Sequence, residues 1–377
     1  MCVLKMKHCV IVGLNYGPVI ESIIDKLRDN YECDVIDVNG VQNAKNKKKQ
    51  SLLSIENKWK KWFVFLSKFF YSVFWYVRQS GNIDVLITMT GPSKFVIPFI
   101  VLRSKKTQHV YFPYDICDFT PFFDIKTKIE KKLEKFCFLS ADKIVYKGLS
   151  SELSHIKYYN LISKTPSYHF RDFISEKKIP PNVPKLSEKD GKIHLVYGGG
   201  WSYKKGIDTV SAFTIYEPFV RNNIHVHVYA LAATKKQFEM FADFENKYSY
   251  FHYEGFKSHS ELLREYPKYD FGLNFCGPLA GLKKYQWYVK SAFSNKIFDY
   301  ISARLPIVVS LSTTALAEFV KSNDVGYILK DKMLYGKNPD FTFLYDKQRY
   351  VQMQKNIAEY ITRSLQENKF LEFIKKK

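Results

Sequence analysis

The chain of 377 residues is long enough for two domains with separate cores, and with 46% hydrophobic residues it is too apolar for an intrinsically disordered protein. Its six cysteines lack C-x-x-C spacing, which argues against a cysteine-bound metal and is typical of reduced thiols in the cytosol. The formal net charge of +21 at pH 7 points to nucleic acid, an anionic membrane or phosphorylated substrates as partners, and no zinc-finger, basic-zipper or RNP motif supports the first.

The first apolar segment, residues 8–13, is predicted to be a strand of the fold and not a signal peptide, because a glycine-containing turn soon interrupts it. A helix and a second strand over residues 33–38 follow. The turn places backbone amides at the carboxyl end of the first strand, where open α/β sheets bind ligands. It is either an acceptor or phosphate loop or simply the turn before a helix. Its candidate residues are Asn15, Tyr16 and Gly17.

A basic run and a helix crowded with aromatic side chains follow, the helix near residues 55–80. Its apolar run is shorter than the ~20 residues of a membrane span, and Lys68 in its middle would cost about 2.5–3.5 kcal/mol in a bilayer. Polar positions, Lys68 and Ser72 among them, form one helical stripe that we expect to be the wet edge. The helix either docks on an anionic membrane or packs as a core helix. The predicted membrane contacts are Lys58, Lys61, Trp62, Phe65 and Phe69.

Strands are next predicted over residues 84–90 and 109–112. The second strand ends in Pro113-Tyr114-Asp115-Ile116-Cys117-Asp118. A carboxylate at this end of a parallel sheet is placed to act as general base on an acceptor hydroxyl. The other interpretation is that Asp115 and Asp118 cap the next helix.

A proline-rich linker near residues 179–191 separates a first domain, residues 1–180, from a second, residues 190–345. Both domains alternate short apolar strands with helices, which predicts two doubly wound α/β domains. The segment 346–377 is predicted to be a helix long enough to cross back to the first domain. The strands expected in the second domain are residues 193–197, 224–230, 250–253, 271–276, 307–309 and 326–329.

One of these strands carries His225 and His227 on alternate positions. We expect them to be strand-face residues, because no cysteine or carboxylate has the spacing of a metal ligand set. The sequence therefore predicts no metal site.

The second domain opens with a strand that runs into Gly198-Gly199-Gly200, and Lys205-Gly206 follows where a helix begins. Three glycines after a strand let the backbone approach a ligand closely, because no Cβ intervenes. The spacing matches neither the Walker A motif nor G-x-G-x-x-G, so neither a P-loop NTPase nor a dinucleotide fold is indicated.

A helix over residues 294–305 feeds directly into the strand at 307–309. Its first turn carries Asn295 and Lys296, where backbone N–H groups and the helix dipole attract phosphate, and Asp299 one turn on offers a partner for a hydroxyl. A basic residue at a helix start is more often a solvated charge. Here the glycine loop upstream supplies a second phosphate-binding element.

At these two stretches the sequence resembles the GT-B glycosyltransferases, particularly the large family 4 and its relatives. Their donor domain opens with a strand, a glycine-containing loop and Lys-Gly-hydrophobic-Asp, as in Lys205-Gly206-Ile207-Asp208. It closes with a helix that begins Asn-Lys and ends before Pro-hydrophobic-Val-Val-Ser, as in Asn295 to Ser310. The two motifs, in this order and about ninety residues apart, are more specific together than either alone.

The resemblance implies two Rossmann-like domains facing a cleft, an acceptor domain followed by a nucleotide-sugar donor domain. Lys205 and Lys296 would hold the donor diphosphate, and Asp299 would accept ribose hydroxyls in place of the usual Glu. The family also places a glycine turn against the nucleobase, which corresponds to Gly255 and Phe256. The predicted donor-binding residues are thus Gly199, Gly200, Lys205, Gly206, Gly255, Phe256, Asn295, Lys296 and Asp299.

The segment from Tyr114 to Asp118 matches a Tyr-Asp-x-x-Asp pattern that faces the acceptor in the family. Two positions depart from the family pattern: Gly200 replaces an Arg, and Ser291 replaces the first carboxylate of a pair. The stereochemical outcome therefore stays open. Asp115, with Asp118 second, would deprotonate the acceptor in an inverting reaction and orient it in a retaining one.

The sequence predicts a glycosyltransferase of the hexosyltransferase type, which moves a sugar from a nucleotide-diphosphate donor to a lipid-linked or cell-envelope glycan. We expect a cytoplasmic protein, peripheral on the inner face of the cell membrane, that needs no metal cofactor. Its predicted partners are the nucleotide sugar, the glycan acceptor and an anionic membrane surface, and no nucleic acid. The alternatives are a non-catalytic membrane-associated scaffold of the same fold and a basic nucleic-acid-binding protein.

Overall fold

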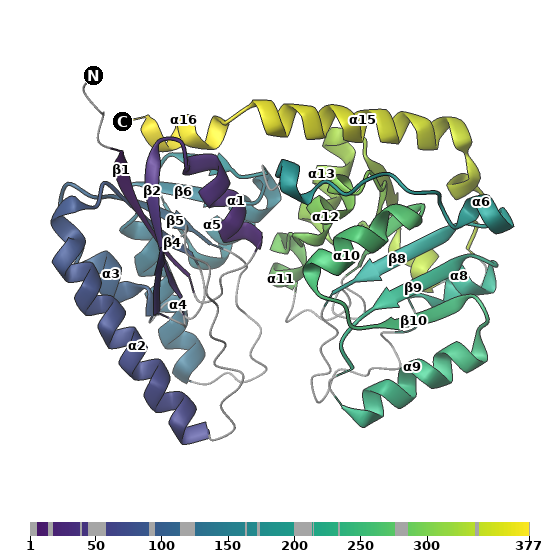
Figure 1. Ribbon diagram of the computed structural model, residues 1–377, viewed down its shortest axis with the longest axis horizontal. Coiled ribbons are helices and arrows are strands. Elements are labelled where there is room, and N and C mark those ends of the chain that lie inside the picture. The colour runs from purple at the N-terminus through teal and green to yellow at the C-terminus, as the bar shows by residue number, and fades with distance from the viewer. Residues whose placement is uncertain are drawn as a thin grey trace. The chain divides into compact units, whose positions relative to one another are not determined.

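The computed structural model of the chain describes residues 6–13, 18–37, 40–43, 58–89, 95–113, 125–162, 164–171, 174–199, 213, 215–232, 234–275, 286–335 and 339–376. The chain divides into two compact units (Figure 1). The first unit comprises Met1–Phe173 and Asn368–Lys377, and the second comprises Ile174–Glu367.

The first unit is built on a seven-stranded sheet in the order β3-β2-β1-β4-β5-β6-β7. All neighbouring strands are parallel except β2 and β3. The central strands are continuous apolar runs because helices cover both faces of a parallel sheet. The strands are β1 Lys7–Val12, β2 Tyr31–Asp37, β3 Gly40–Asn43, β4 Val85–Met89, β5 Gln108–Phe112, β6 Lys143–Tyr146 and β7 Ser167–His169.

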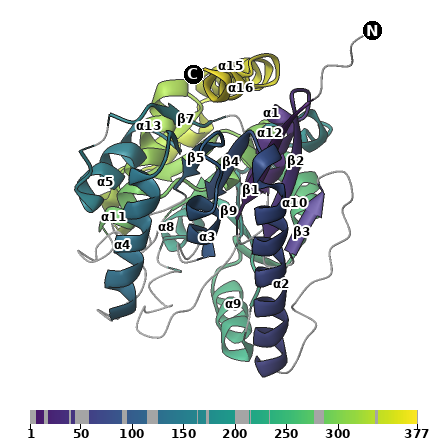
Figure 2. The same ribbon diagram turned by 90° about the vertical axis from the view of Figure 1, so that its left-hand side faces the viewer.

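Figure 2 shows the helices around this sheet, with α2 running along the outside of the unit beside β3 and α3. Among the described residues no helix combines the length and apolarity needed to span a bilayer. The helices are α1 Pro18–Leu27, α2 Lys58–Gln79, α3 Ile97–Val101, α4 Ile125–Leu139, α5 Leu149–Tyr159 and, from the end of the chain, α16 Lys369–Lys375.

The expected single terminal helix is divided in two, and only its last part belongs to the first unit. The first helix, α15, spans Lys347–Gln366. Asn368 then interrupts the helix, because its side-chain oxygen accepts from the backbone N–H of Leu371 at 3.1 Å and starts α16. The Asn368 amide also donates to the carbonyl of Lys26 at 2.7 Å, which fixes α16 at the end of α1.

The second unit is built on a six-stranded parallel sheet in the order β10-β9-β8-β11-β12-β13. Right-handed connections outward from β8 to β10 place α8 and α9 on one face, and the return to β11 places α10, α12 and α13 on the other (Figure 1). The strands are β8 His194–Gly198, β9 His225–Tyr229, β10 Phe251–Gly255, β11 Phe271–Asn274, β12 Ile307–Ser310 and β13 Gly326–Leu329.

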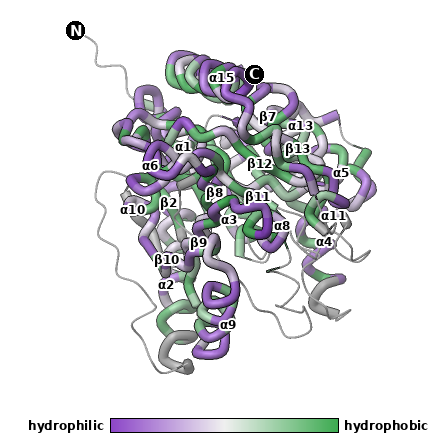
Figure 3. Tube along the Cα trace, turned by 90° about the vertical axis from the view of Figure 1, so that its right-hand side faces the viewer, coloured by the Kyte–Doolittle hydropathy of each residue, from purple (hydrophilic) through white to green (hydrophobic). Residues whose placement is uncertain are grey.

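The helices of the second unit bury one side against this sheet. Figure 3 shows the amphipathic pattern along α9 and α15, whose trace alternates between hydrophilic and hydrophobic residues. The helices are α6 Ser187–Asp190, α8 Glu217–Arg221, α9 Lys235–Lys247, α10 His259–Glu265, α11 Gln286–Ser291, α12 Lys296–Ser302, α13 Thr314–Asn323, α14 Asp331–Tyr335 and α15.

The expected linker near residues 179–191 lies inside the second unit. Its backbone is anchored there, because the N–H of Leu186 donates to the carbonyl of Lys268 at 2.8 Å. The Arg304 guanidinium also donates to the Asn182 side chain at 2.9 Å. The chain therefore leaves the first unit several residues before the proline-rich stretch.

Candidate functional site

Tyr300 fixes α12 against the carboxyl ends of two central strands of the second unit. Its hydroxyl accepts from the N–H of Gly198 at 3.2 Å and donates to the carbonyl of Leu273 at 3.1 Å. The ring lies directly on β11, where a Cβ on Gly272 would be 2.4 Å from it. Burial raises the pKa of Tyr300 far above its usual range, so the group remains a neutral hydroxyl that can both donate and accept.

Because α12 is held this way, the Lys296 side chain lies along the end of β8. A Cβ placed on Gly199 would be 2.8 Å from Lys296 Nζ, and Gly199 has a φ of +145°, which few residues other than glycine adopt. The ammonium also sits 4.0 Å from the centre of the Tyr197 ring. The structure therefore brings together the glycine bend and the start of the Asn-Lys helix, the two motifs found in the sequence. Asn295 occupies the N-cap position of that helix.

Asp299 lies one turn further along α12 and is already engaged. Its Oδ1 lies 3.0 Å from Nε2 of His259, the first residue of α10. The Asp299 and His259 side chains are 16% and 38% exposed, so the pair borders solvent. His259 thus orients the carboxylate predicted to receive hydroxyl groups.

Gly255 and Phe256 lie at the same edge of the sheet as Gly199. Gly255 ends β10 with a φ of +72°, and its carbonyl accepts from the N–H of Ala230 at 3.0 Å. The N–H of Gly199 donates in turn to the carbonyl of Tyr229 at 3.0 Å. Phe256 is 67% exposed, so its ring is available to stack on a planar group.

Several predicted residues lie outside the described part of the chain. In the first unit, β1 ends at Val12 and β5 ends at Phe112, with only β4 between them in the parallel sheet. The predicted acceptor segments follow these two strand ends. The residues concerned are Asn15, Tyr16, Gly17, Asp115 and Asp118 in the first unit, and Gly200, Lys205 and Gly206 in the second.

The aromatic helix α2 presents to solvent a different face from the one predicted. Ser72, expected on the wet edge, is buried, and its hydroxyl donates to the carbonyl of Lys68 at 2.8 Å. Phe65 and Phe69, predicted to contact a membrane, pack instead against Phe95 at ring distances of 5.1 and 5.6 Å. Lys58, Lys61 and Trp62 fall within α2, but their side chains lie outside the described part of the structure.

The opposite face of α2 carries large apolar side chains that are exposed in the described part of the structure. They recur at spacings of three and four residues and therefore form one continuous stripe. Their exposure ranges from 38% to 75%, and they are Phe63, Leu66, Phe70, Phe74 and Val77. This exposed stripe is more apolar than a solvated helix face normally is.

Sequence reasoning missed three residues that shape the donor end of the second unit, namely Tyr197, His259 and Tyr300. Tyr300 stands in the Asn-Lys motif itself, and Tyr197 directly precedes the triple glycine, so both could have been identified from the motifs. His259 has no such signal, since it lies 40 positions from Asp299 in the sequence.

Two Rossmann-like units, each with a mainly parallel sheet flanked by helices, make this a protein of the GT-B fold, the architecture of a large class of glycosyltransferases. Residues 219–374 match the model of the glucosyltransferase 3-like C-terminal domain. Among curated proteins, none matches this sequence.

Solved structures agree on the fold over nearly the whole chain. One described as trehalose-6-phosphate from E. coli bound with UDP-2-fluoro glucose matches with a TM-score of 0.60 at 11% identity, covering 98% of this chain and 99% of the other. The lipopolysaccharide outer core galactosyltransferase WaaB matches with a TM-score of 0.59 at 15% identity, covering 98% of each chain. These findings confirm the predicted resemblance to GT-B glycosyltransferases.

Proposed function

We propose that the chain is a glycosyltransferase that takes its sugar from a nucleoside-diphosphate donor held by the second unit. The observation that carries the proposal is the closeness of Lys296 to Gly199, because it places a cation beside a glycine at the carboxyl end of β8. The fold and the match to a glucosyltransferase 3-like domain support the same class of reaction. One structural neighbour was determined with UDP-2-fluoro glucose.

In this scheme the Lys296 ammonium neutralises the diphosphate as the bond to the sugar breaks. A preorganised cation stabilises the charge that develops on the leaving group, so a metal ion is not required there. The Tyr197 ring holds the ammonium from one side and leaves its other donors to phosphate oxygens. Lys205 and the glycine loop would supply further contacts.

The pair Asp299 and His259 would receive the ribose. An ionised Asp299 side chain can only accept hydrogen bonds. Its Oδ1 is bonded to His259, so its Oδ2 would accept from a sugar hydroxyl. Gly255 and Phe256, two strands away at the same sheet edge, would take the base. In the first unit, Asp115 would act on the acceptor as base or as orienting group, with Asp118 second.

We further propose that the acceptor is a lipid-linked or cell-envelope glycan and that α2 docks the protein on the inner face of the membrane. The exposed stripe of α2 supports this proposal, although it uses Phe63, Phe70 and Phe74 and not the predicted Phe65 and Phe69. Each phenylalanine that enters lipid contributes roughly 1.5–3 kcal/mol. Each lysine near an anionic surface adds about 1 kcal/mol.

Calorimetric titration of the full chain with uridine, guanosine and adenosine diphosphates tests the donor proposal. We expect one nucleoside diphosphate to bind, and Lys296→Ala to weaken it roughly 10- to 150-fold through lost charge-assisted hydrogen bonds. Lys321→Ala, an exposed lysine on α13, is the matched control and should bind as the unmodified chain does. Equal binding by both variants would refute the role of Lys296. If no nucleoside diphosphate binds, the result would favour a non-catalytic scaffold of the same fold. If the chain binds an oligonucleotide more tightly than any nucleoside diphosphate, the result would favour a nucleic-acid-binding protein.

A further inference from the structure

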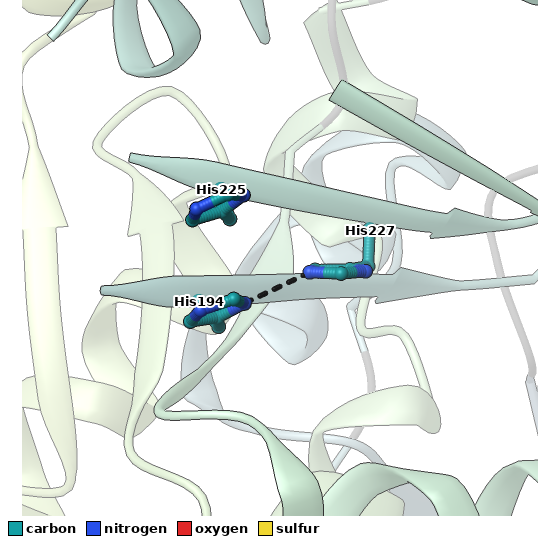
Figure 4. A group of neighbouring side chains, drawn as sticks. All are labelled: His194, His225 and His227. Carbon is teal, nitrogen blue, oxygen red and sulfur yellow. Dashed lines mark hydrogen bonds between the residues drawn. The ribbon is translucent and has the colours of Figure 1, made fainter. Parts of the chain in front are cut away.

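Four histidines gather on one face of the second sheet, at the amino ends of β8, β9 and β10. His194 and His225 are the first residues of neighbouring strands and pair in register. His227 and His252 pair in the same way on β9 and β10. The His194 and His225 rings are parallel with centres 4.3 Å apart, and His227 lies beside them (Figure 4). The group lies at the sheet edge opposite to Gly199.

Two carboxylates contact three of these histidines, each through one ring nitrogen. An oxygen of Asp190 lies 3.2 Å from Nε2 of His194 and 3.2 Å from Nε2 of His225. Glu254 Oε1 lies 2.8 Å from Nδ1 of His227. Ionised carboxylates only accept hydrogen bonds, so the hydrogen-bonded nitrogens of His194 and His227 must carry a proton. The tautomers of neutral His194 and His227 are thereby fixed.

The remaining nitrogens of these two rings, Nδ1 of His194 and Nε2 of His227, are then lone pairs. They lie only 3.0 Å apart (Figure 4). Two lone pairs at this distance repel each other unless a proton or another cation lies between them.

We propose that His194, His225 and His227 bind a zinc ion through the nitrogens that face away from the carboxylates. Each of the three rings can offer one nitrogen such that all three lie within 4.8 Å of one another. Two nitrogens on a tetrahedral zinc ion, each about 2.0–2.1 Å from it, are about 3.4 Å apart, close to the spacing of the His194 and His227 nitrogens. Neutral imidazole is a preferred zinc ligand.

The surroundings match those of a structural zinc site. Metal-bound histidines usually donate their other N–H to a carboxylate, which here is the role of Asp190 and Glu254. His252 Nε2 lies 2.8 Å from Nδ1 of His225, closer than two nitrogens on one zinc ion, and is a hydrogen-bond partner of that ring. Because the His194 and His225 rings are parallel, their nitrogens do not point to one position, so binding turns at least one ring. The ion would join β8 to β9.

This site could not be predicted from the sequence, because its carboxylates are contributed by other elements. Asp190 belongs to α6, within the stretch predicted to be a linker, and Glu254 lies on β10. The three ligands also carry no Cys or His-x-x-x-His spacing. Only the folded sheet brings the carboxylates to the rings.

Titration of the untagged full chain with Zn²⁺ after treatment with a chelator tests the proposal. We expect one equivalent to bind, to raise the melting temperature, and to be replaced by Co²⁺ with the visible absorption of a tetrahedral site. His225→Gln should abolish stoichiometric binding. Glu254→Gln, which keeps all ligands, should weaken it 10- to 100-fold.

His169→Gln is the matched control, because it removes a comparable contact, 2.7 Å from His169 Nε2 to Glu152, in the first unit. It should leave zinc binding unchanged. Circular dichroism checks the fold of each variant. If His225→Gln does not fold, the zinc affinity of Glu254→Gln tests the proposal. Absence of stoichiometric binding by the unmodified chain, or equal affinity in Glu254→Gln and His169→Gln, would overturn the proposal. Neither readout depends on glycosyl transfer.

Discussion

Replacing Gly199 with alanine should weaken donor binding and lower stability through two separable effects. The first is backbone strain, because Gly199 has a φ of +145°. A residue with a Cβ in such a conformation loses about 1–3 kcal/mol, and the free energy of unfolding should fall by that amount. The second is displacement of Lys296, since the new Cβ would lie 2.8 Å from its Nζ and 3.1 Å from its Cε.

The displaced lysine determines the size of the binding effect. Its flexible side chain can move away without much loss of stability, but the ammonium then leaves the position beside the strand end. Charge-assisted hydrogen bonds to phosphate contribute about 1.5–3 kcal/mol, so the Kd for the nucleoside diphosphate should rise roughly 10- to 150-fold. Calorimetric titration measures this change, and urea unfolding measures the change in stability.

A control and a double-mutant cycle separate the two effects. Gly191→Ala places a Cβ at a φ of +72° with nothing within 4 Å, so it should reduce stability and leave the Kd unchanged. In a Lys296→Ala background, Gly199→Ala should have no further effect on the Kd, because the group it displaces is gone. Additive effects on the Kd would refute the proposed action of Gly199 through Lys296.

Three further predictions concern α2, the stability of the first unit in acid and the packing of α12 on β11. Replacing exposed Phe70 and Phe74 with serine should abolish sedimentation with anionic vesicles at unchanged circular dichroism, and retained sedimentation would contradict membrane docking by α2. Burial lowers the pKa of His155 to about 4, below the ~6.5 of the unfolded chain, so stability falls by about 1.4 kcal/mol per unit as pH drops from 6.5 to 4. His155→Phe should flatten this slope in urea unfolding, and an unchanged slope would contradict the buried neutral ring. Gly272→Ala puts a Cβ 2.4 Å from the Tyr300 ring and should reduce stability by about 1–3 kcal/mol and weaken donor binding, whereas an unchanged Kd would show that Tyr300 does not position α12.

The parallel strands could be predicted because each is a short, fully apolar run. β5 and β12 are buried over almost their whole length, and hydrophobic runs between helices identify such strands. The edge strands β3 and β7 were missed. β3 has the sequence Gly-Val-Gln-Asn, and an edge strand needs neither an apolar run nor alternation when only one neighbour pairs with it.

The two phosphate motifs could be found because each depends on residues close together in sequence. Their partners could not be found in this way. His259 reaches Asp299, and Asp190 reaches His225, only because the β8–β9 and α10–α12 contacts form in the folded unit. A side-chain contact between residues 35 or 40 positions apart leaves no periodic trace in a single sequence.

The aromatic helix α2 shows a different limit of prediction from sequence. Periodicity along α2 separates its polar from its apolar side but does not say which side the rest of the unit covers. The hydroxyl of Ser72 can turn inward because its own helix supplies the acceptor, the carbonyl of Lys68. The aromatic rings of the other side, such as Phe70 and Phe74, are then left exposed.

The second sheet separates its two candidate sites along a single strand. β8 begins with His194 at the histidine group and ends with Gly198 beside the proposed donor position, roughly 13 Å away. An ion bound at the amino edge would stabilise the folded unit by mass action and raise its unfolding free energy. It would not contact the donor, so its removal should lower the melting temperature while the Kd for the nucleoside diphosphate stays the same. Changes at the carboxyl edge, such as Gly199→Ala, should alter both the melting temperature and the Kd, because the strained backbone of Gly199 lies beside the Lys296 ammonium.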